Sequence, residues 1–363
     1  MRLEPIMIPR IFSMALTAVV LSMTITSGAF GFRDVLDTPA LRSRLAPKTL
    51  LNGVTRAGSR IVSVGWRGHI VYSDNQGKSW SQASVPVSSD LVAVHFPSPQ
   101  KGWAVGHDGV VLHSSDGGTT WTKQFDGRAA VRIMMSTTTE HARKDFSGGT
   151  EARQRLIEDV KQLAQEGPSK PFLDVWFDDE KTGFIVGTFN LIFHTVDGGK
   201  NWESWFDRTE NPKRLHFYAV RRIGQDLFLC GEQGMVLKLD QRARRFRACN
   251  LPHKATFFGI IGKPGTVTVF GLRGHAFRSQ DGGDNWQKVA TKVQVGLTGA
   301  TVAEDGRIIL VSQEGNVLMS TDDGASFNPV KVARPIPASA VIAFDKDTLL
   351  LAGLLGLHIQ RLR

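Results

Sequence analysis

The sequence has very few of the residues on which small disulfide scaffolds and zinc sites depend. Cysteine occurs only twice in 363 residues, at Cys230 and Cys249. Two cysteines exclude a disulfide framework, and the chain has neither of the common zinc signatures C-x-x-C and H-E-x-x-H. Histidines such as His69 and His275 fall at matching positions of separate repeats, which lie far apart in a repeat array and do not form one coordination set. We therefore expect no metal ion and no cofactor.

Long hydrophobic runs are also missing, with one exception near the N-terminus. Arg2 and Arg10 precede the apolar run of residues 11–26, and Ser27 and Ala29 form a small-x-small cleavage pattern. These features predict a signal peptide over residues 1–29. The run is short for a bilayer span, and no cysteine follows it to carry a lipid. We expect the mature chain to be exported to the periplasm, or to a thylakoid lumen-like compartment in a phototroph, without a transmembrane span.

A polar turn motif, by contrast, recurs along the chain. It reads Ser/Thr-x-Asp-x-Gly-x-x-Trp/Phe, and its first copy has asparagine in place of aspartate. A further position, residues 239–246, keeps only the aromatic residue, Phe246. The motif residues are Ser73, Asn75, Gly77, Trp80, Ser114, Asp116, Gly118, Trp121, Thr195, Asp197, Gly199, Trp202, Ser279, Asp281, Gly283, Trp286, Ser320, Asp322, Gly324 and Phe327.

Glycine turns and short apolar runs recur together with this motif. The turns are separated by about 40 residues, apart from one interval of about twice that length, and this period is typical of a four-stranded propeller blade. The sequence therefore predicts an all-β fold, a seven-bladed β-propeller over residues 30–363. The turn glycines or their equivalents are Gly65, Gly106, Gly187, Gly231, Gly271, Ser312 and Gly353.

The double interval predicts an insertion of about residues 126–170 between blades 2 and 3. Apolar residues at helical spacing predict a helix that begins near Thr150 and ends at Gly167-Pro168. This stripe can either pack onto the propeller or wait for a partner helix. The stripe consists of Ala152, Leu156, Ile157, Val160, Leu163 and Ala164.

The last repeat supplies only three strands before the chain stops. A propeller must close its ring, because an open blade exposes a long unpaired edge. We expect residues of about 32–45 to supply the missing strand. In the same framework Cys230 and Cys249 lie on strands that are not neighbours, so we expect two free and mostly buried thiols.

The repeated aspartate has two interpretations, catalytic or structural. A catalytic aspartate is singular and faces a cleft, whereas copies spread around a ring cannot share one site. The carboxylate and hydroxyl can instead close a tight turn, which is the interpretation we adopt. A sialidase-like site would need an arginine triad and a nucleophilic tyrosine, and only Tyr72 and Tyr218 are available. We expect no enzyme, and the alternative is a carbohydrate-binding or glycoside-hydrolysing propeller.

The motif is that of BNR or Asp-box repeats. Its pairing with KGWAVG at 101–106 and KTGFIVG at 181–187 resembles the photosystem II assembly and stability-factor propeller family, in its bacterial exported branch. The resemblance implies a non-catalytic, protein-binding factor for a membrane protein complex. That complex would be photosystem II in a phototroph and another envelope complex, transporter or exporter component elsewhere. We expect a monomer.

The chain is basic, with a formal net charge of +10. Its densest basic run, residues 242–247, falls on or beside the outermost strand of blade 4, where charges commonly protect an edge. Export argues against nucleic acid as a partner. A partner or membrane-surface contact of this run is the other interpretation.

The turns between second and third strands are the predicted recognition surface. They share one face with the blade-to-blade links and therefore with the insertion, whereas the Asp-boxes lie on the opposite face. Their polar residues vary between equivalent turns, as a recognition surface requires. The candidate partner-binding residues are Arg67, His107, Asp108, Glu232, Arg273 and Glu314.

Overall fold

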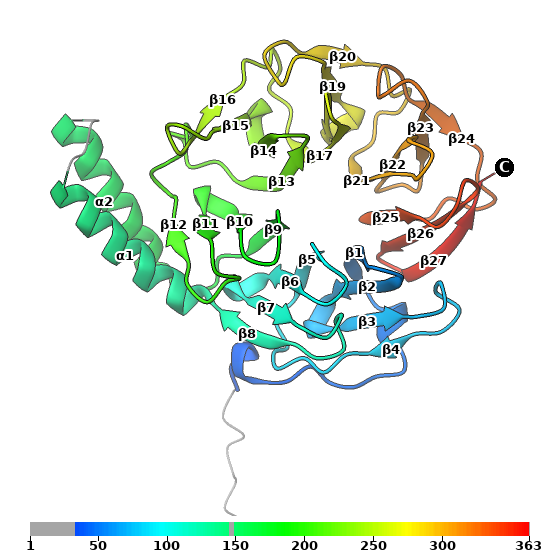
Figure 1. Cartoon of the computed structure of the whole chain (residues 1–363), viewed down its shortest axis with the longest axis horizontal. Coiled ribbons are helices and arrows are strands. Elements are labelled where there is room, and N and C mark those ends of the chain that lie inside the picture. The colour runs from blue at the N-terminus through cyan, green and yellow to red at the C-terminus, as the bar shows by residue number, and fades with distance from the viewer. Residues whose placement is uncertain (1–32, 145–148, 363) are drawn as a thin grey trace, which may run out of the picture. The chain divides into compact units, whose positions relative to one another are not determined.

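The structure, a computed structural model, describes residues 33–144 and 149–362. From Asp34 onward the chain builds seven antiparallel sheets arranged in a ring (Figure 1). In each sheet the strands follow one another in sequence order, and we name them A to D from the central channel outward. The predicted seven-bladed propeller is confirmed. The predicted signal peptide lies outside the described residues.

The first three blades include the two that flank the helical insertion, blades 2 and 3. Blade 1 contains β1 (Leu51–Ala57), β2 (Arg60–Gly65), β3 (Ile70–Ser73) and β4 (Ser81–Gln82). Blade 2 contains β5 (Leu91–His95), β6 (Gly102–Gly106), β7 (Val111–Ser114) and β8 (Thr122–Phe125). Blade 3 contains β9 (Phe172–Phe177), β10 (Gly183–Gly187), β11 (Ile192–Thr195) and β12 (Glu203–Ser204).

The remaining four blades complete the ring. Blade 4 contains β13 (Phe217–Ile223), β14 (Asp226–Gly231), β15 (Val236–Asp240) and β16 (Arg245–Ala248). Blade 5 contains β17 (Phe257–Lys263), β18 (Thr266–Gly271), β19 (Ala276–Ser279) and β20 (Gln287–Val289). Blade 6 contains β21 (Leu297–Val302), β22 (Ile308–Ser312), β23 (Val317–Ser320) and β24 (Asn328–Val330). Blade 7 contains β25 (Ala340–Ala343), β26 (Thr348–Gly353) and β27 (Gly356–Arg361).

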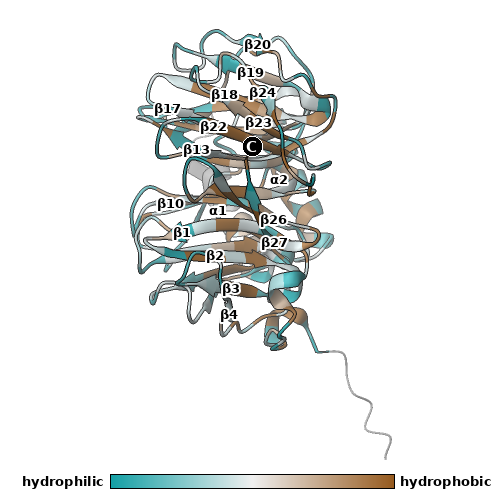
Figure 2. Cartoon of the chain, turned by 90° about the vertical axis from the view of Figure 1, so that its right-hand side faces the viewer, coloured by the Kyte–Doolittle hydropathy of each residue, from teal (hydrophilic) through white to brown (hydrophobic). Residues whose placement is uncertain are grey.

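The hydrophobic core lies between neighbouring blades. The B strands are covered on both faces, which is why β6, β10 and β22 are buried along their whole length and read as continuous apolar runs. In Figure 2 the hydrophobic residues concentrate within the strands. Large aromatic side chains join adjacent sheets; Trp103 of blade 2, for example, stacks on Phe177 of blade 3 with ring centroids 3.6 Å apart.

The Asp-box motif closes the turn between strands C and D. In blade 5 the Ser279 hydroxyl donates to Asp281 (2.7 Å) and accepts the N–H of Gly283 (2.9 Å), while Asp281 accepts the backbone N–H of Asn285 (2.9 Å). The indole N–H of Trp286 donates to the Gly283 carbonyl (2.9 Å). Blades 2, 3 and 6 repeat the Ser/Thr–Asp–Gly part of this network, and blade 1 does so with Asn75 in place of aspartate. The carboxylates are therefore used inside the turns.

The insertion is a hairpin of two helices, α1 (Gly127–Lys144) and α2 (Gly149–Gln165). The sequence predicted α2 but missed α1. Asp126 caps α1 by accepting the N–H groups of Arg128 (3.0 Å) and Ala129 (3.2 Å). The apolar stripe of α2 packs inward, with Leu156 and Val160 buried in the same cluster as Phe172 of blade 3. Of the two interpretations of the stripe, packing onto the propeller is the one that the structure shows.

The predicted closure of blade 7 is wrong in the described residues. Its sheet has three strands, and residues 34–43 run instead beside the link between blades 1 and 2. Leu36 is 2% exposed in the core shared by these two blades, Ala40 donates its N–H to the Val85 carbonyl (3.1 Å), and Ser88 donates to the Val35 carbonyl (2.8 Å). Burial of Leu36 there holds the segment away from β27.

Side-chain packing closes the ring instead. Ile61 of blade 1 forms one buried cluster with Ile342 and Leu350 of blade 7, and Trp80 packs against it. The Arg56 guanidinium donates to the Ala343 carbonyl (2.8 Å) across the same junction. Blade 7 is therefore fastened to blade 1 without exchanging a strand.

Both cysteines are free, as predicted. Cys230 is the next-to-last residue of β14 and is buried, and Cys249 follows β16 and is partly buried. Burial raises the pKa of both thiols, to about 11 for Cys249. Both groups are thiols at neutral pH.

Candidate binding site at the mouth of the central channel

One end of the central channel is lined by residues of the A strands that are left out of the regular strand pairing. Near the start of strands β1, β5, β9, β13, β17 and β21 the pairing register skips one residue. Such a bulge re-aims the skipped side chain. The skipped residues all line one cavity: Asn52, Val92, Leu173, Tyr218, Phe258 and Thr298.

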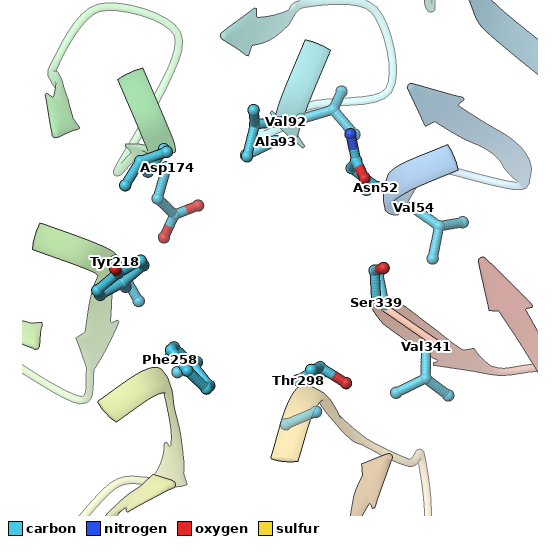
Figure 3. A pocket seen from close by; sticks show the side chains of 18 of the residues that line it. Asn52, Val54, Val92, Ala93, Asp174, Tyr218, Phe258, Thr298, Ser339 and Val341 are labelled. Atoms are coloured by element: carbon cyan, nitrogen blue, oxygen red, sulfur yellow. The ribbon is translucent and has the colours of Figure 1, made fainter. Parts of the chain in front are cut away.

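This cavity has a volume of about 600 Å³ and takes residues from all seven inner strands. Figure 3 shows Asn52, Tyr218, Phe258, Thr298 and Ser339 around it. Its size falls within the range of ligand and peptide pockets. The wall combines apolar side chains with polar ones. The cavity can therefore hold an extended segment with mixed side chains.

The wall contributed by blades 3 and 4 carries a buried ion pair. Asp174, with its side chain 5% exposed, accepts a hydrogen bond from Arg221 and from the Val220 N–H (2.8 Å). Burial raises the pKa of Asp174, and Arg221 and the Val220 N–H act in the opposite direction. Arg221 also lies over the Trp176 ring, 5.7 Å from its centroid. The arginine thus contacts both the carboxylate and the indole ring, while 34% of its side chain remains exposed.

His95 of blade 2 packs beside this ion pair, although it does not line the cavity itself. It stacks on Trp176 with ring centroids 4.3 Å apart, and its Nδ1 accepts the Phe177 N–H at 3.1 Å. Burial, helped by the charge of Arg221, lowers the pKa of His95 to about 3. The ring is therefore neutral at neutral pH and acts as an acceptor.

The BC turns, between strands B and C, surround this opening. In six blades the first turn residue donates its N–H to the carbonyl that precedes the A strand of the same blade, as Trp66 does to Leu50 (3.0 Å) and His107 to Asp90 (2.8 Å). These bonds hold the turns beside the channel. We call this side of the ring the mouth face and the opposite side the Asp-box face. In blades 1 to 5 the BC turn forms a short 3-10 helix: η3 (Trp66–Gly68), η4 (His107–Gly109), η5 (Thr188–Asn190), η6 (Glu232–Gly234) and η7 (Leu272–Gly274).

The second residue of these turns adopts a left-handed backbone, which non-glycine residues rarely do. Its φ is 53° at Arg67 and 56° at Arg273. The third residue is usually glycine because a side chain does not fit: a Cβ at Gly234 would lie 1.7 Å from the His253 carbonyl oxygen. Tight anchoring at both ends leaves the second side chain projecting from the turn.

The structure places all six predicted partner-binding residues on the mouth face. They surround the opening in five blades and do not gather in one patch. Of the six, only His107 lines the cavity itself. Asp108 accepts the Ser89 hydroxyl (2.9 Å), and Glu232 accepts the His216 N–H (2.8 Å). Arg67, Arg273 and Glu314 are exposed. The sequence missed the bulged cavity residues, although each directly follows the buried hydrophobe that opens its strand.

The helical hairpin borders the same face. Gly127 at the start of α1 packs against Gly109 of the blade 2 BC turn, and a Cβ on Gly127 would lie 1.9 Å from the Pro168 carbonyl oxygen. The two ends of the insertion are therefore pressed together beside the mouth. Arg214, from the link between blades 3 and 4, pairs with Asp159 of α2 (2.8 Å).

Residues considered for an enzymatic site are not brought together. Tyr218 lines the cavity, whereas Tyr72 lies on β3 with the Arg60 guanidinium 4.4 Å from its ring centroid. Arg221 is the arginine among the described residues that line the cavity, and Asp174 binds it. The described part of the chain also shows no grouping of three His, Cys, Asp or Glu side chains suited to a metal ion. Within the same residues, no helix has the length and hydropathy to cross a bilayer.

Solved propellers share this fold. A structure described as "YCF48 bound to D1 peptide" superimposes with a TM-score of 0.61 at 15% identity, covering 90% of this chain and 99% of that one. YCF48 from Cyanidioschyzon merolae gives a TM-score of 0.58 at 13% identity, covering 86% of this chain and 96% of that chain.

Sequence comparison identifies relatives with assembly roles. The Photosystem II assembly lipoprotein Ycf48 of Synechococcus sp. (strain CC9902) is 24% identical over 45% of this chain and 50% of its own length. The chloroplastic Photosystem II stability/assembly factor HCF136 of Oryza sativa subsp. japonica is 23% identical over 57% of this chain and 54% of its own. The chain spans about half the length of these curated relatives. The model of the family described as Photosynthesis system II assembly factor YCF48 matches residues 72–142 and 158–344. The chain therefore belongs to this family of photosystem II assembly factor-like propellers.

Proposed function

We propose that this chain is a non-catalytic, exported propeller that binds a membrane protein complex as an assembly or stability factor. In a phototrophic host the complex is of the photosystem II type, and in another host it is a different envelope complex. Family membership supports the proposal, since the named relatives are assembly factors. One solved relative is described as bound to a D1 peptide, so a propeller of this kind can hold a peptide segment.

The observation that carries the proposal is the mouth of the channel. All seven blades contribute to one open cavity of about 600 Å³, and turns with differing side chains surround it. The Asp-box face, in contrast, repeats nearly the same closed turn from blade to blade. We place the partner contact at the mouth face, beside the hairpin.

The hairpin would extend this contact through its polar surface. Its apolar side chains Ala130, Met134, Leu156 and Val160 are buried against the propeller. Arg132 of α1 and Arg153 and Arg155 of α2 remain exposed. A partner beside the ring therefore meets charged side chains of the hairpin and the rim of the cavity together.

Affinity capture from solubilised host membranes tests the proposal. We expect the wild-type chain to retain the subunits of one membrane complex. Replacing residues 128–168 by a short Gly-Ser linker should abolish this retention while leaving a folded propeller. A second variant changes Arg132, Arg153 and Arg155 to Glu and keeps the buried stripe. A loss of capture in this variant therefore cannot be caused by removal of the hairpin's packing against the propeller. The matched control changes Lys78, Lys200 and Lys346 of the Asp-box face to Glu.

Undiminished capture by both hairpin variants, with loss in the Asp-box-face control, would overturn the choice of face. Failure of the wild-type chain to retain any membrane protein subunit would overturn the proposed function itself.

A further inference from the structure

Large apolar side chains stand exposed in BC turns of the mouth face. Phe189 of blade 3, at 40% exposure, contacts His216 and Lys170 beside the hairpin, and the others lie in blades 1, 5 and 7. Trp66 of blade 1 is 45% exposed, Leu272 of blade 5 is 40% exposed, and Leu354 and Leu355 of blade 7 are 65% and 49% exposed. All four lie in BC turns, at the tips of their blades. Exposed apolar groups that share one face mark an interaction surface.

Basic side chains accompany them. Lys48, Arg67, Arg273 and Arg334 are exposed in the turns and links of the same blades, and none forms an ion pair with another described residue. Arg67 lies over the Trp66 ring, 4.9 Å from its centroid. Glu314 is the exposed acidic residue of the blade 6 turn between them. We call the set the basic apolar arc: Lys48, Trp66, Arg67, Leu272, Arg273, Arg334, Leu354 and Leu355.

The Asp-box face has the opposite character. Its turns carry many carboxylates, among them Asp74, Asp179, Asp281, Asp323 and Asp347. Val196 is the large apolar side chain that its CD turns leave exposed, at 64%. Several of these carboxylates are paired with basic side chains of the same face, as Asp74 is with Arg60 and Asp323 with Lys263. The cations of the arc have no such partners in the described part of the chain, so an extended negative surface would attract the mouth face.

We propose that the basic apolar arc docks onto an anionic lipid surface. Its apolar residues lie at turn tips near basic side chains, and none of them is among the residues that line the channel cavity. This pattern suits the interface of a bilayer, where tryptophan and leucine enter between headgroups and lysine or arginine binds phosphate. Docking by the arc would turn the mouth face and the hairpin toward the membrane. It goes beyond the proposed function, because it needs no protein partner.

Binding to vesicles tests the arc. Purified chain is mixed with vesicles of phosphatidylcholine containing phosphatidylglycerol, or with phosphatidylcholine alone, and bound protein is measured by sedimentation. All variants carry the same N-terminus, so any contribution of residues 1–32 is equal. We expect binding to the anionic vesicles that weakens as salt is added.

Two sets of substitutions isolate the arc. Changing Lys48, Arg67, Arg273 and Arg334 to Gln should weaken binding roughly a hundredfold or more, since each basic group near an anionic surface contributes about fivefold. The matched control removes the same number of charges from the Asp-box face, by changing Lys78, Lys200, Arg242 and Lys346 to Gln. It should bind within about twofold of the wild type. Equal losses in both sets would overturn the proposal.

Brominated acyl chains give a second readout. They should quench the fluorescence of Trp66, and the Trp66→Phe variant should lose that quenching while still sedimenting with the vesicles. An arc variant that binds vesicles normally but fails to capture a membrane complex would show a protein-binding arc, which contradicts lipid docking. The linker variant of the hairpin should bind vesicles like the wild type, so failure of the proposed function and failure of lipid docking are separable.

Discussion

The two faces of the ring are built from the same repeat but close their turns in different ways. A CD turn with an Asp-box bonds to itself: Ser279 and Asp281 satisfy the N–H groups of Gly283 and Asn285. A BC turn instead bonds to a neighbouring segment, as Trp66 does to the Leu50 carbonyl. Side chains therefore hold the first kind of turn together. The second kind is anchored by a backbone bond, which side chains supplement, as where Asp90 accepts the Arg67 N–H (2.7 Å).

This difference determines which side chains are free to vary. In an Asp-box the side chains of the serine, aspartate and tryptophan are used in contacts within the turn. In a BC turn the anchored backbone fixes the shape, so the second residue can be Arg67, Asp108, Phe189, Gln233 or Arg273. A repeat protein can thus hold one face constant and diversify the other.

The largest expected effect comes from the backbone of a BC turn. Gly234→Ala would place a Cβ 1.7 Å from the His253 carbonyl oxygen at a φ of 79°, so backbone must shift. We expect a loss of about 4 kcal/mol or more in the free energy of unfolding, measured by urea denaturation.

Gly265→Ala is the matched control on the opposite face. Its φ is 86°, but nothing lies within 4 Å of the added Cβ. Only the conformational penalty applies, about 1–2 kcal/mol. Equal losses at Gly234 and Gly265 would show that close packing does not govern the BC turn.

A smaller effect is expected from the side chains of an Asp-box. Ser279 is 1% exposed, and Ser279→Ala leaves the Gly283 N–H without its acceptor. We expect a loss of about 1–3 kcal/mol by the same measurement. Ser326→Ala removes a partly exposed hydroxyl that donates to Asp322 (2.7 Å) and should cost less than half as much. A larger loss at Ser326 would contradict the assignment of the buried serine as the centre of the turn.

The smallest effect concerns acid stability. Hydrogen bonds from the backbone and side chain of Asn285, and from Ser279, lower the pKa of Asp281 to about 2. Its contribution to stability is complete above the usual pKa of 3.8 and is lost as the pH falls toward 2. Asp281→Asn should therefore flatten the fall in melting temperature between about pH 4 and pH 2.

Blade 1 provides the natural reference for this change. Its box already has Asn75, whose side-chain oxygen accepts from Ser73 (2.9 Å) and from the Ser79 N–H (2.9 Å). We expect Asn75→Asp to steepen the same fall. An unchanged acid profile in both variants would mean that these turns do not couple to global unfolding.

The sequence could predict the blades and both sets of turns because each repeat contains the same buried hydrophobes and the same turn residues. It could not predict α1, because Ser136 and the threonines after it are weak helix formers, and burial of Ala130 and Met134 against the propeller compensates. The prediction that residues 32–45 complete blade 7 failed for a related reason. Leu36 finds its buried position only in the folded core, which no local pattern reveals.

The candidate site divides in the same way. Turn spacing was sufficient to place Arg67 and Arg273 on the mouth face. The cavity residues escaped because a bulge turns Tyr218 and Thr298 out of the alternation that a regular strand would impose. In each bulged A strand the cavity residue is the one that directly follows the first buried apolar residue, so this rule would have identified the cavity residues.

The closure by packing has a consequence for biosynthesis. The chain is made from its N-terminus, so blades 1 to 6 can form in order while their last neighbour is still missing. Ile61 and Trp80 gain their partners Ile342 and Leu350 only after nearly the whole chain has been made. Until then a growing arc of blades exposes two apolar ends, which is the state most open to aggregation or to a chaperone. The last blade is therefore the step that covers both apolar ends, and a chain that lacks it leaves Ile61 without its partners Ile342 and Leu350.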